Sequence, residues 1–355
     1  MKIFVYPAHC DGKHIPGVDY VRVIRPMEEL AKQPGFEVEI YNGENTGDWR
    51  KYAKKLAKEF DVLYLNYTTN AWGYVAIASQ FDMAGKKIVY DIDDLIWEIQ
   101  EDNAAYSVYA PGSEGRATIT DIIARGCDAV TCTNDFLRKG IAEYTGKELD
   151  KIKVFKNYID LDLYKWKSKR KDSYEITIGY FGSSSHFNDL VNPGFIDALE
   201  RIMAEYPQVR FYTIGAMIQS IKKKFGSRYT TGFGDHDIYK WVKMMPLLLA
   251  DVDIFVAPLK DLTYARAKSG IKYLEYSSMQ VPGVYQDIRQ YHEIVEDGKN
   301  GFLCKTTTEW YKSLKALIED KELRRKIGLE AYKTVKKDWQ IQNNVKQYVD
   351  FFNEL

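Results

Sequence analysis

Short apolar runs alternate along nearly the whole chain with stretches in which apolar residues recur every three or four positions. The short runs predict buried strands and the longer stretches predict amphipathic helices, a pattern typical of α/β proteins with parallel sheets. In the first half, strands are predicted at 3–6, 38–41, 62–66, 87–90, 129–133 and 152–156. Helices are predicted there at 20–33, 50–60, 119–126 and 135–144.

A charged stretch at 165–171 interrupts this alternation and predicts a linker. Beyond it the pattern resumes, with strands predicted at 176–181, 209–214, 254–258 and 281–285, and helices at 193–206, 238–249, 321–337 and 339–355. A chain of 355 residues is too long for one ordinary core, so we expect two α/β domains, at 1–163 and 164–338. A ligand would bind between them, at the carboxyl ends of the strands.

Charge and cysteine content narrow the class of protein. Lys and Arg together number 50, as do Asp and Glu, and the resulting net charge of zero disfavours a general nucleic-acid binder. The four cysteines form no C-x-x-C pair, so we expect reduced thiols and a cytoplasmic location. No signal-peptide pattern is visible, and charges interrupt the longest apolar region, 241–259, which disfavours a membrane span.

Two segments of the second half have the composition of phosphate-binding turns. In the stretch S-G-I-K-Y-L-E at 269–275, a predicted helix begins after a loop, and free N–H groups at a helix start attract anions. Glu275 could accept hydrogen bonds from ribose hydroxyls. The turn Gly182-Ser183-Ser184 follows a predicted strand, and its small residues would let backbone N–H groups approach a phosphate. An ordinary connection between strand and helix is the alternative for that turn.

The stretch from Ser269 to Gly301 resembles the donor-binding segment of the retaining GT-B glycosyltransferases of group 1 (family 4). The shared features are Leu274-Glu275, a P-G-V strand and the sequence E-x-V-x-D-G-x-x-G-x-L, and similarity extends to 128–137, 152–160 and 254–303. The resemblance implies a GT-B fold, with two Rossmann-like domains facing each other across a cleft and the helix at 339–355 packed back on the first. It also implies transfer of a sugar, with retention, from a UDP-, GDP- or dTDP-sugar to a glycan, lipid-linked or other acceptor hydroxyl, in the synthesis of surface polysaccharide or another glycoconjugate.

The chain departs from that family at the diphosphate. The family has Gly-Arg where this chain has Gly182-Ser183, and its first Glu is replaced by Ala267. Lys268 is the best substitute for the missing basic residue, the arginine of the family's Gly-Arg pair. Its positive charge would add to that of the helix terminus at Ser269-Gly270. Arg266 is a lesser candidate.

The first domain is expected to supply the acceptor side. Gly17, near the first helix, is predicted to approach the diphosphate. Asp91, Asp93 and Asp94 follow a predicted strand, and one of them could act as general base on the acceptor hydroxyl. A D-x-D pair can also hold Mn²⁺ or Mg²⁺, but that role belongs to the GT-A architecture, so we expect neither a metal nor another cofactor. Asp94 could instead cap a helix.

Other functions stay open at this level. A GT-B nucleotide-sugar epimerase, a catalytically silent sugar-nucleotide-binding protein and a DNA-modifying glycosyltransferase are the alternatives; the neutral charge disfavours the last, and Ala267 favours the silent protein. Peripheral contact with an anionic membrane is a further possibility, because one helix carries five basic residues: Arg50, Lys51, Lys54, Lys55 and Lys58. A solvated helix face is the alternative for that helix.

Overall fold

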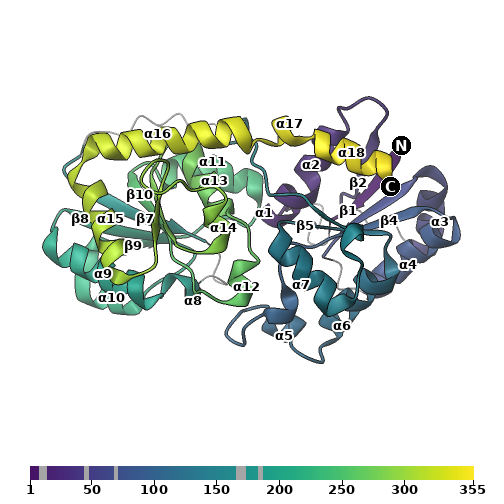
Figure 1. Ribbon diagram of the computed structural model, residues 1–355, viewed down its shortest axis with the longest axis horizontal. Helices are drawn as coiled ribbons and strands as arrows, with labels where there is room; N and C mark the ends of the chain where they lie inside the picture. The colour runs from purple at the N-terminus through teal and green to yellow at the C-terminus, as the bar shows by residue number, and fades with distance from the viewer. Residues whose placement is uncertain (8–13, 44–47, 68–70, 165–172, 183–186) are drawn as a thin grey trace.

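The computed structural model describes residues 1–7, 14–43, 48–67, 71–164, 173–182 and 187–355. Ser183 and Ser184, both predicted to bind the donor, lie outside these ranges. The chain forms two lobes, each built on a six-stranded parallel sheet surrounded by helices (Figure 1). This arrangement confirms the predicted α/β class with two Rossmann-like domains.

The first sheet has the strand order β2-β1-β3-β4-β5-β6, and every neighbouring pair is parallel. Its strands are β1 (Lys2–Tyr6), β2 (Glu37–Ile40), β3 (Val62–Asn66), β4 (Lys87–Asp91), β5 (Ala129–Cys132) and β6 (Ile152–Val154). All six lie within two residues of their predicted ends. The central strands are recognisable in sequence because they are buried on both faces and therefore form continuous apolar runs.

The helices of this lobe fill the connections between its strands. The first is continuous from α1 (Gly17–Asp19) through a π-helical stretch (Tyr20–Ile24) to α2 (Arg25–Leu30). It is followed by α3 (Trp49–Glu59), α4 (Ala71–Met83), α5 (Tyr106–Tyr109), α6 (Glu114–Asp121), a π-helical stretch (Ile122–Gly126) and α7 (Asp135–Thr145). The Asp48 carboxylate caps α3 by accepting hydrogen bonds from two backbone N–H groups of its first turn.

The second sheet has the strand order β12-β11-β10-β7-β8-β9. Counted within the lobe this is the 3-2-1-4-5-6 order of dinucleotide-binding folds, read from the other edge. Its strands are β7 (Ile176–Phe181), β8 (Val209–Ile214), β9 (Tyr229–Gly232), β10 (Val252–Ala257), β11 (Gly283–Gln286) and β12 (Phe302–Cys304). The order reverses between β7 and β10, so a crevice for ligands is expected outside their carboxyl ends.

The helices of the second lobe are α8 (Phe187–Leu190), α9 (Pro193–Glu205), α10 (Gln219–Phe225), α11 (Ile238–Leu248), α12 (Thr263–Arg266), α13 (Ile271–Ser278), α14 (Arg289–His292), α15 (Thr307–Glu319) and α16 (Lys321–Asp338). The chain then returns to the first lobe through α17 (Ile341–Asn344) and α18 (Lys346–Glu354), in yellow in Figure 1. There the Tyr348 ring lies 4.1 Å from that of Phe155, and the Phe352 ring 5.9 Å from that of Tyr64. The single helix predicted at 339–355 is therefore broken in two.

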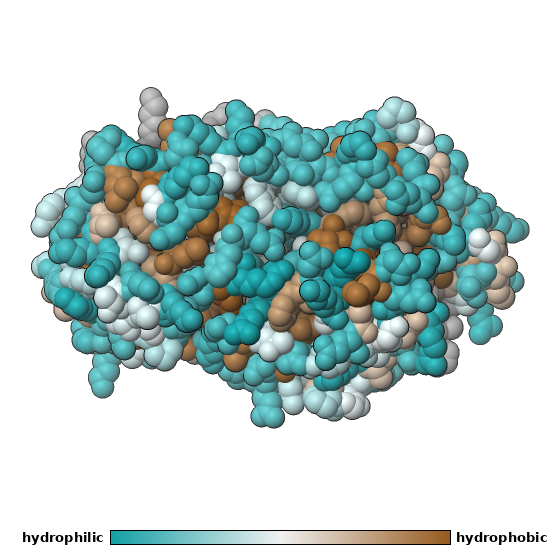
Figure 2. Space-filling view, in the orientation of Figure 1, coloured by the Kyte–Doolittle hydropathy of each residue, from teal (hydrophilic) through white to brown (hydrophobic). Residues whose placement is uncertain are grey.

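The two lobes are in direct contact. Their largest apolar cluster contains residues of both, and the rings of Tyr20 and Tyr239 meet edge to face at 5.5 Å. The backbone of Ile15 donates to the Asp237 carboxylate and accepts from the N–H of Ile238. The outer face in Figure 2 is mainly hydrophilic, with hydrophobic patches on both lobes. No helix in the described part of the chain is long and apolar enough to cross a membrane.

Candidate functional site

Lys272 lies at the carboxyl end of β7, beside the point where the strand order reverses. Its Nζ donates a 2.9 Å hydrogen bond to the carbonyl of Phe181, the last residue of the strand. A side chain at Gly182 would be crowded, since its Cβ would stand 2.9 Å from this Nζ. Burial lowers the pKa of Lys272 to about 8. The ammonium thus lies beside Gly182, the first residue of the segment that the sequence predicts to bind a phosphate.

Glu275 lies one turn further along α13. Residues three apart share a helix face, so its carboxyl group lies on the same side as the Lys272 ammonium. Burial raises the pKa of Glu275 to about 7, while the Lys272 charge and a hydrogen bond with Tyr164 act in the opposite direction. Tyr164 comes from the segment that links the two lobes. The contact of Glu275 with a ribose stays a prediction.

Lys268 lies at the lobe boundary. Its Nζ is 3.5 Å from the Asp94 carboxylate of the first lobe and 4.7 Å from the centre of the Tyr264 ring. Its side chain is 20% exposed, so the Asp94 carboxylate balances part of the charge that was expected to meet a diphosphate. Arg266 instead is exposed, and its guanidinium forms two hydrogen bonds with Asp261, which lies in the loop before α12.

The remaining predicted donor residues lie at helix starts. Gly270 is the N-cap residue of α13, and a Cβ there would lie 3.2 Å from the carbonyl oxygen of Gln290. The Ser269 hydroxyl accepts a 2.8 Å hydrogen bond from Asn157 of the first lobe. Gly17 begins α1 and faces the side chain of Ile238 across the boundary, which leaves ordinary contact space at its Cα.

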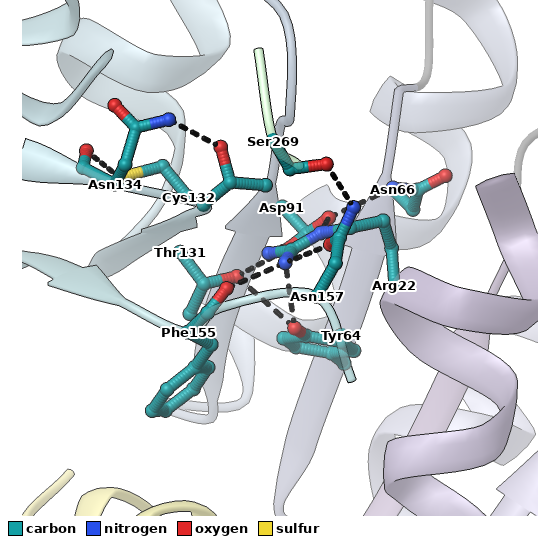
Figure 3. A network of polar contacts seen from close by, with 11 residues as sticks. Arg22, Tyr64, Asn66, Asp91, Thr131, Cys132, Asn134, Phe155, Asn157 and Ser269 are labelled. Carbon is teal, nitrogen blue, oxygen red and sulfur yellow. Dashed lines mark hydrogen bonds and ion pairs between the residues drawn. The ribbon is translucent and has the colours of Figure 1, made fainter. Parts of the chain in front are cut away.

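Asp91 is not a general base. Its carboxylate is fully buried at the end of β4, and both of its oxygens accept hydrogen bonds from the Arg22 guanidinium (Figure 3). Asn66 and Thr131 donate to it as well. A base must reach its substrate, and this group is enclosed by its partners, so the prediction for Asp91 is corrected to a structural ion pair.

Asp93 and Asp94 are half-buried in the loop after β4. Burial, followed by the neighbouring Asp94 carboxylate, raises the pKa of Asp93 above its usual range. Asp94 accepts a 2.8 Å hydrogen bond from the Tyr264 hydroxyl of the second lobe. A carboxyl group with a raised pKa is a better proton acceptor, which keeps Asp93 a candidate for the base.

No group of three or more His, Cys, Asp or Glu side chains that could hold a metal ion occurs in the described ranges. A groove of about 710 Å³ lies between α3 and α4. Its basic side is formed by Arg50, Lys54 and Lys58, and Met83, which is 70% exposed, lies at its other side.

Comparison with known proteins identifies the second lobe. The sequence profile described as Glycosyl transferases group 1 matches residues 175–320. This region is a glycosyl transferases group 1 domain. The putative glycosyltransferase EpsD of Bacillus subtilis (strain 168) is 30% identical over 148 residues, a match that covers 39% of this chain and 36% of EpsD. The family resemblance predicted from the sequence is thus confirmed.

Solved structures share the whole architecture. Anabaena HepE in complex with UDP-glucose has a TM-score of 0.69 at 18% identity, with 100% of both chains covered. Sucrose-phosphate synthase from Thermosynechococcus elongatus has a TM-score of 0.70 at 12% identity, over 100% of this chain and 98% of that one. These likenesses confirm the GT-B fold.

The group 1 glycosyltransferase domain contains one candidate that sequence reasoning missed. Lys272 was not singled out, because a lysine in the first turn of a short helix is usually a solvated surface residue. Its spacing of three residues from Glu275 was the available signal. Only the approach of α13 to β7, about ninety residues earlier in the chain, shows that its ammonium reaches the end of that strand.

Proposed function

We propose that the protein is a glycosyltransferase that moves a sugar from a nucleotide-sugar to an acceptor hydroxyl with retention of configuration. The observation that carries this proposal is the placement of the Lys272 ammonium beside Gly182, with Glu275 one turn further along the same helix, at the strand-order reversal of a group 1 domain. Ligands of open α/β sheets bind at such reversals, outside the carboxyl ends of the strands. A cation and a carboxyl group on one helix face match a diphosphate and its ribose.

The second lobe would contribute to catalysis by electrostatic stabilisation. The leaving nucleoside diphosphate develops negative charge as the glycosidic bond breaks, and preorganised cations and N–H groups stabilise that charge. Lys272 would provide the cation and the start of α13, at Ser269-Gly270, would provide N–H groups. Lys268 becomes a second cation only when its ion pair with Asp94 is released. Because these groups meet the charge, no metal ion is required.

We infer the donor from a solved structure with the same fold, and the proton acceptor from the geometry of the first lobe. HepE, which shares the fold, is described in complex with UDP-glucose, and this supports a UDP-sugar as donor over a GDP- or dTDP-sugar. Asp93 would receive the proton of the acceptor hydroxyl, with Asp94 oriented beside it by Tyr264. The acceptor would be a glycan or a lipid-linked sugar of surface polysaccharide synthesis.

We also propose that α3 contacts the cytoplasmic face of an anionic membrane. The basic side chains of α3 point away from the core, since the apolar residues Ala53, Leu56 and Ala57 of the same helix are buried. The groove between α3 and α4 combines this charge with an exposed methionine, which fits the headgroup and upper acyl region of a phospholipid.

Product analysis tests the function. The purified protein is first screened by thermal shift with UDP-, GDP- and dTDP-glucose, since a ligand that binds the folded state alone raises the melting temperature. The stabilising donor is then incubated with and without candidate glycan and lipid-linked acceptors. Release of nucleoside diphosphate that requires acceptor, with an axial product linkage by NMR from an axial donor, supports retaining transfer. Conversion of the donor sugar without acceptor would establish the epimerase instead.

A further inference from the structure

The first lobe contacts a segment of three consecutive residues, 267–269, which is separated from the start of α13 only by its N-cap residue, Gly270. Each residue is held from a different strand end. After β5, Asn134 donates a 2.6 Å hydrogen bond to the carbonyl of the first residue. After β4, Asp94 forms an ion pair with the ammonium of the central lysine at 3.5 Å. After β6, Asn157 donates a 2.8 Å hydrogen bond to the hydroxyl of the last residue.

The segment is also packed into the first lobe. Ala267 is fully buried, and the other buried members of its apolar cluster all lie between residues 4 and 152. A carboxylate at this position would lose its hydration among apolar side chains, which is costly unless it is paired. The alanine that departs from the family pattern is therefore suited to this packing.

A buried network orients the two asparagines. The Asn157 amide oxygen accepts a 2.9 Å hydrogen bond from Arg22, which is 1% exposed and is held in turn by Asp91 (Figure 3). The Asn157 amide therefore has one side fixed in the first lobe and the other bonded to Ser269. The Asn134 oxygen accepts from the N–H of Leu137 and from Arg289, while its nitrogen points to the segment. The bonds from Leu137 and Arg22 lie within the first lobe and preorganise both side chains, whereas Arg289 belongs to the second lobe and adds a further bond to Asn134 across the boundary.

We propose that the 267–269 segment is an interdomain latch, gripped by Asn134 and Asn157 when the lobes close. Because α13 begins two residues after the segment, the grip fixes the start of this helix and hence the positions of Lys272 and Glu275. The two asparagines are positioning residues. Their effect on transfer rests on the proposed function, whereas the grip itself is a property of the fold.

Hydrogen exchange of the full-length protein, followed by mass spectrometry, tests the latch. The variants are Asn134→Ala, Asn157→Ala, Ser269→Ala and the double variant Asn157→Ala/Ser269→Ala. Amides at 262–275 are expected to exchange at least about fivefold faster in each single variant, because a local hydrogen bond to a fixed partner is lost. Amides of α9 are expected to keep the wild-type rate. The control is Asn343→Ala, which removes two hydrogen bonds to the end of α16, away from the latch.

The double variant separates the latch from a general loss of stability. If Asn157 and Ser269 act through one bond, the double variant resembles either single one, whereas unrelated effects add. Ser269→Ala also tests the bond should Asn157→Ala fail to fold. Exchange at 262–275 within twofold of wild type in all the variants, or additive effects of Asn157 and Ser269, would overturn the latch. UDP affinity and kcat against KM are measured in parallel, with kcat/KM expected to fall about fivefold in the single variants. A wild-type protein without transferase activity would refute the proposed function and leave the exchange result intact.

Discussion

The Lys272 ammonium and the Phe181 carbonyl are joined by a 2.9 Å hydrogen bond that ties α13 to the end of β7. A donor diphosphate at the turn after β7 would meet this charge. We predict that Lys272→Met lowers kcat/KM by about 100-fold, the loss typical of removing one preorganised electrostatic group from an active site. Steady-state kinetics with the donor identified by thermal shift measures it.

The matched control for this prediction is Arg266→Met. Arg266 is an exposed basic residue six positions earlier, and its guanidinium pairs with Asp261 in the loop before α12. Its loss is expected to change kcat/KM by less than about twofold, as for most exposed ion pairs. Equal effects of the two substitutions would contradict the assignment of Lys272.

The affinity for UDP is predicted to have a maximum between about pH 7 and pH 8. Burial raises the pKa of Glu275 to about 7, and the ionised form is the better acceptor for ribose hydroxyls, so affinity falls as the pH drops below that value. Burial lowers the pKa of Lys272 to about 8, so the cation and the affinity are lost as the pH rises above it. Isothermal calorimetry from pH 5.5 to 9.5 measures both limbs.

Glu275→Gln isolates the acid limb of this profile. The amide cannot ionise, so the affinity of the variant for UDP is expected to fall less steeply at low pH than that of the wild type. The difference is the contribution of Glu275 to the acid limb. The phosphate of UDP titrates near pH 6 as well and keeps its own contribution in both proteins. An acid limb that is the same in wild type and Glu275→Gln would exclude Glu275 as its source.

Much of the fold follows from the hydrophobic pattern. The central strands of the first sheet are buried apolar runs, and all six strands of that sheet were predicted. β9 and β12 were not, because β9 (Tyr229–Gly232) contains two threonines and a glycine and β12 (Phe302–Cys304) has three residues. The helix α4 (Ala71–Met83) was missed as well, since apolar residues occupy nearly all its faces and give no amphipathic period. The turn at 297–301 leads into β12, which is parallel to β11.

The site could be predicted only in part, because its decisive contacts join residues far apart in the chain. Glu275 and Gly182 were found from local composition. The role of Asp91 was misjudged because its partner, Arg22, lies 69 residues earlier and has no local signature. The ion pair between Lys268 and Asp94 likewise crosses the lobe boundary and has no local signature in the sequence.

The aspartates of the first lobe are predicted to have separable roles. Asp91→Asn leaves the buried Arg22 guanidinium without its counter-charge and should lower the free energy of unfolding by about 3–5 kcal/mol. Asp93→Asn should leave that free energy unchanged or raised at pH 8, because the folded state raises the pKa of Asp93 and thus disfavours its ionised form. Its kcat should fall at least about 100-fold if it is the base. Urea unfolding and kinetics on both variants decide; normal kcat in Asp93→Asn would exclude that base.

The basic face of α3 is predicted to bind anionic vesicles. Each lysine near such a surface contributes about 1 kcal/mol, so Lys54→Glu/Lys58→Glu should weaken binding to phosphatidylserine vesicles by about thirtyfold or more. The double variant Lys223→Glu/Lys243→Glu makes the same charge change at exposed positions of the second lobe and is expected to have little effect. Sedimentation at two salt concentrations measures both. Equal loss in the two variants would indicate attraction by net charge alone.

Restoring the family's glutamate at position 267 is predicted to lower the activity. Ala267→Glu recreates the family's first carboxylate. If this carboxylate had the same chemical role here as in the family, the substitution would raise the activity. Ala267 is buried among apolar residues of the first lobe, with its carbonyl bonded to Asn134. A carboxylate there must either lose its hydration or force the segment out of the lobe boundary. We therefore expect kcat/KM to fall at least about tenfold, whereas Ala267→Ser, which adds one small hydroxyl, should retain most activity. Higher activity in Ala267→Glu would show that the segment turns toward the donor sugar during turnover.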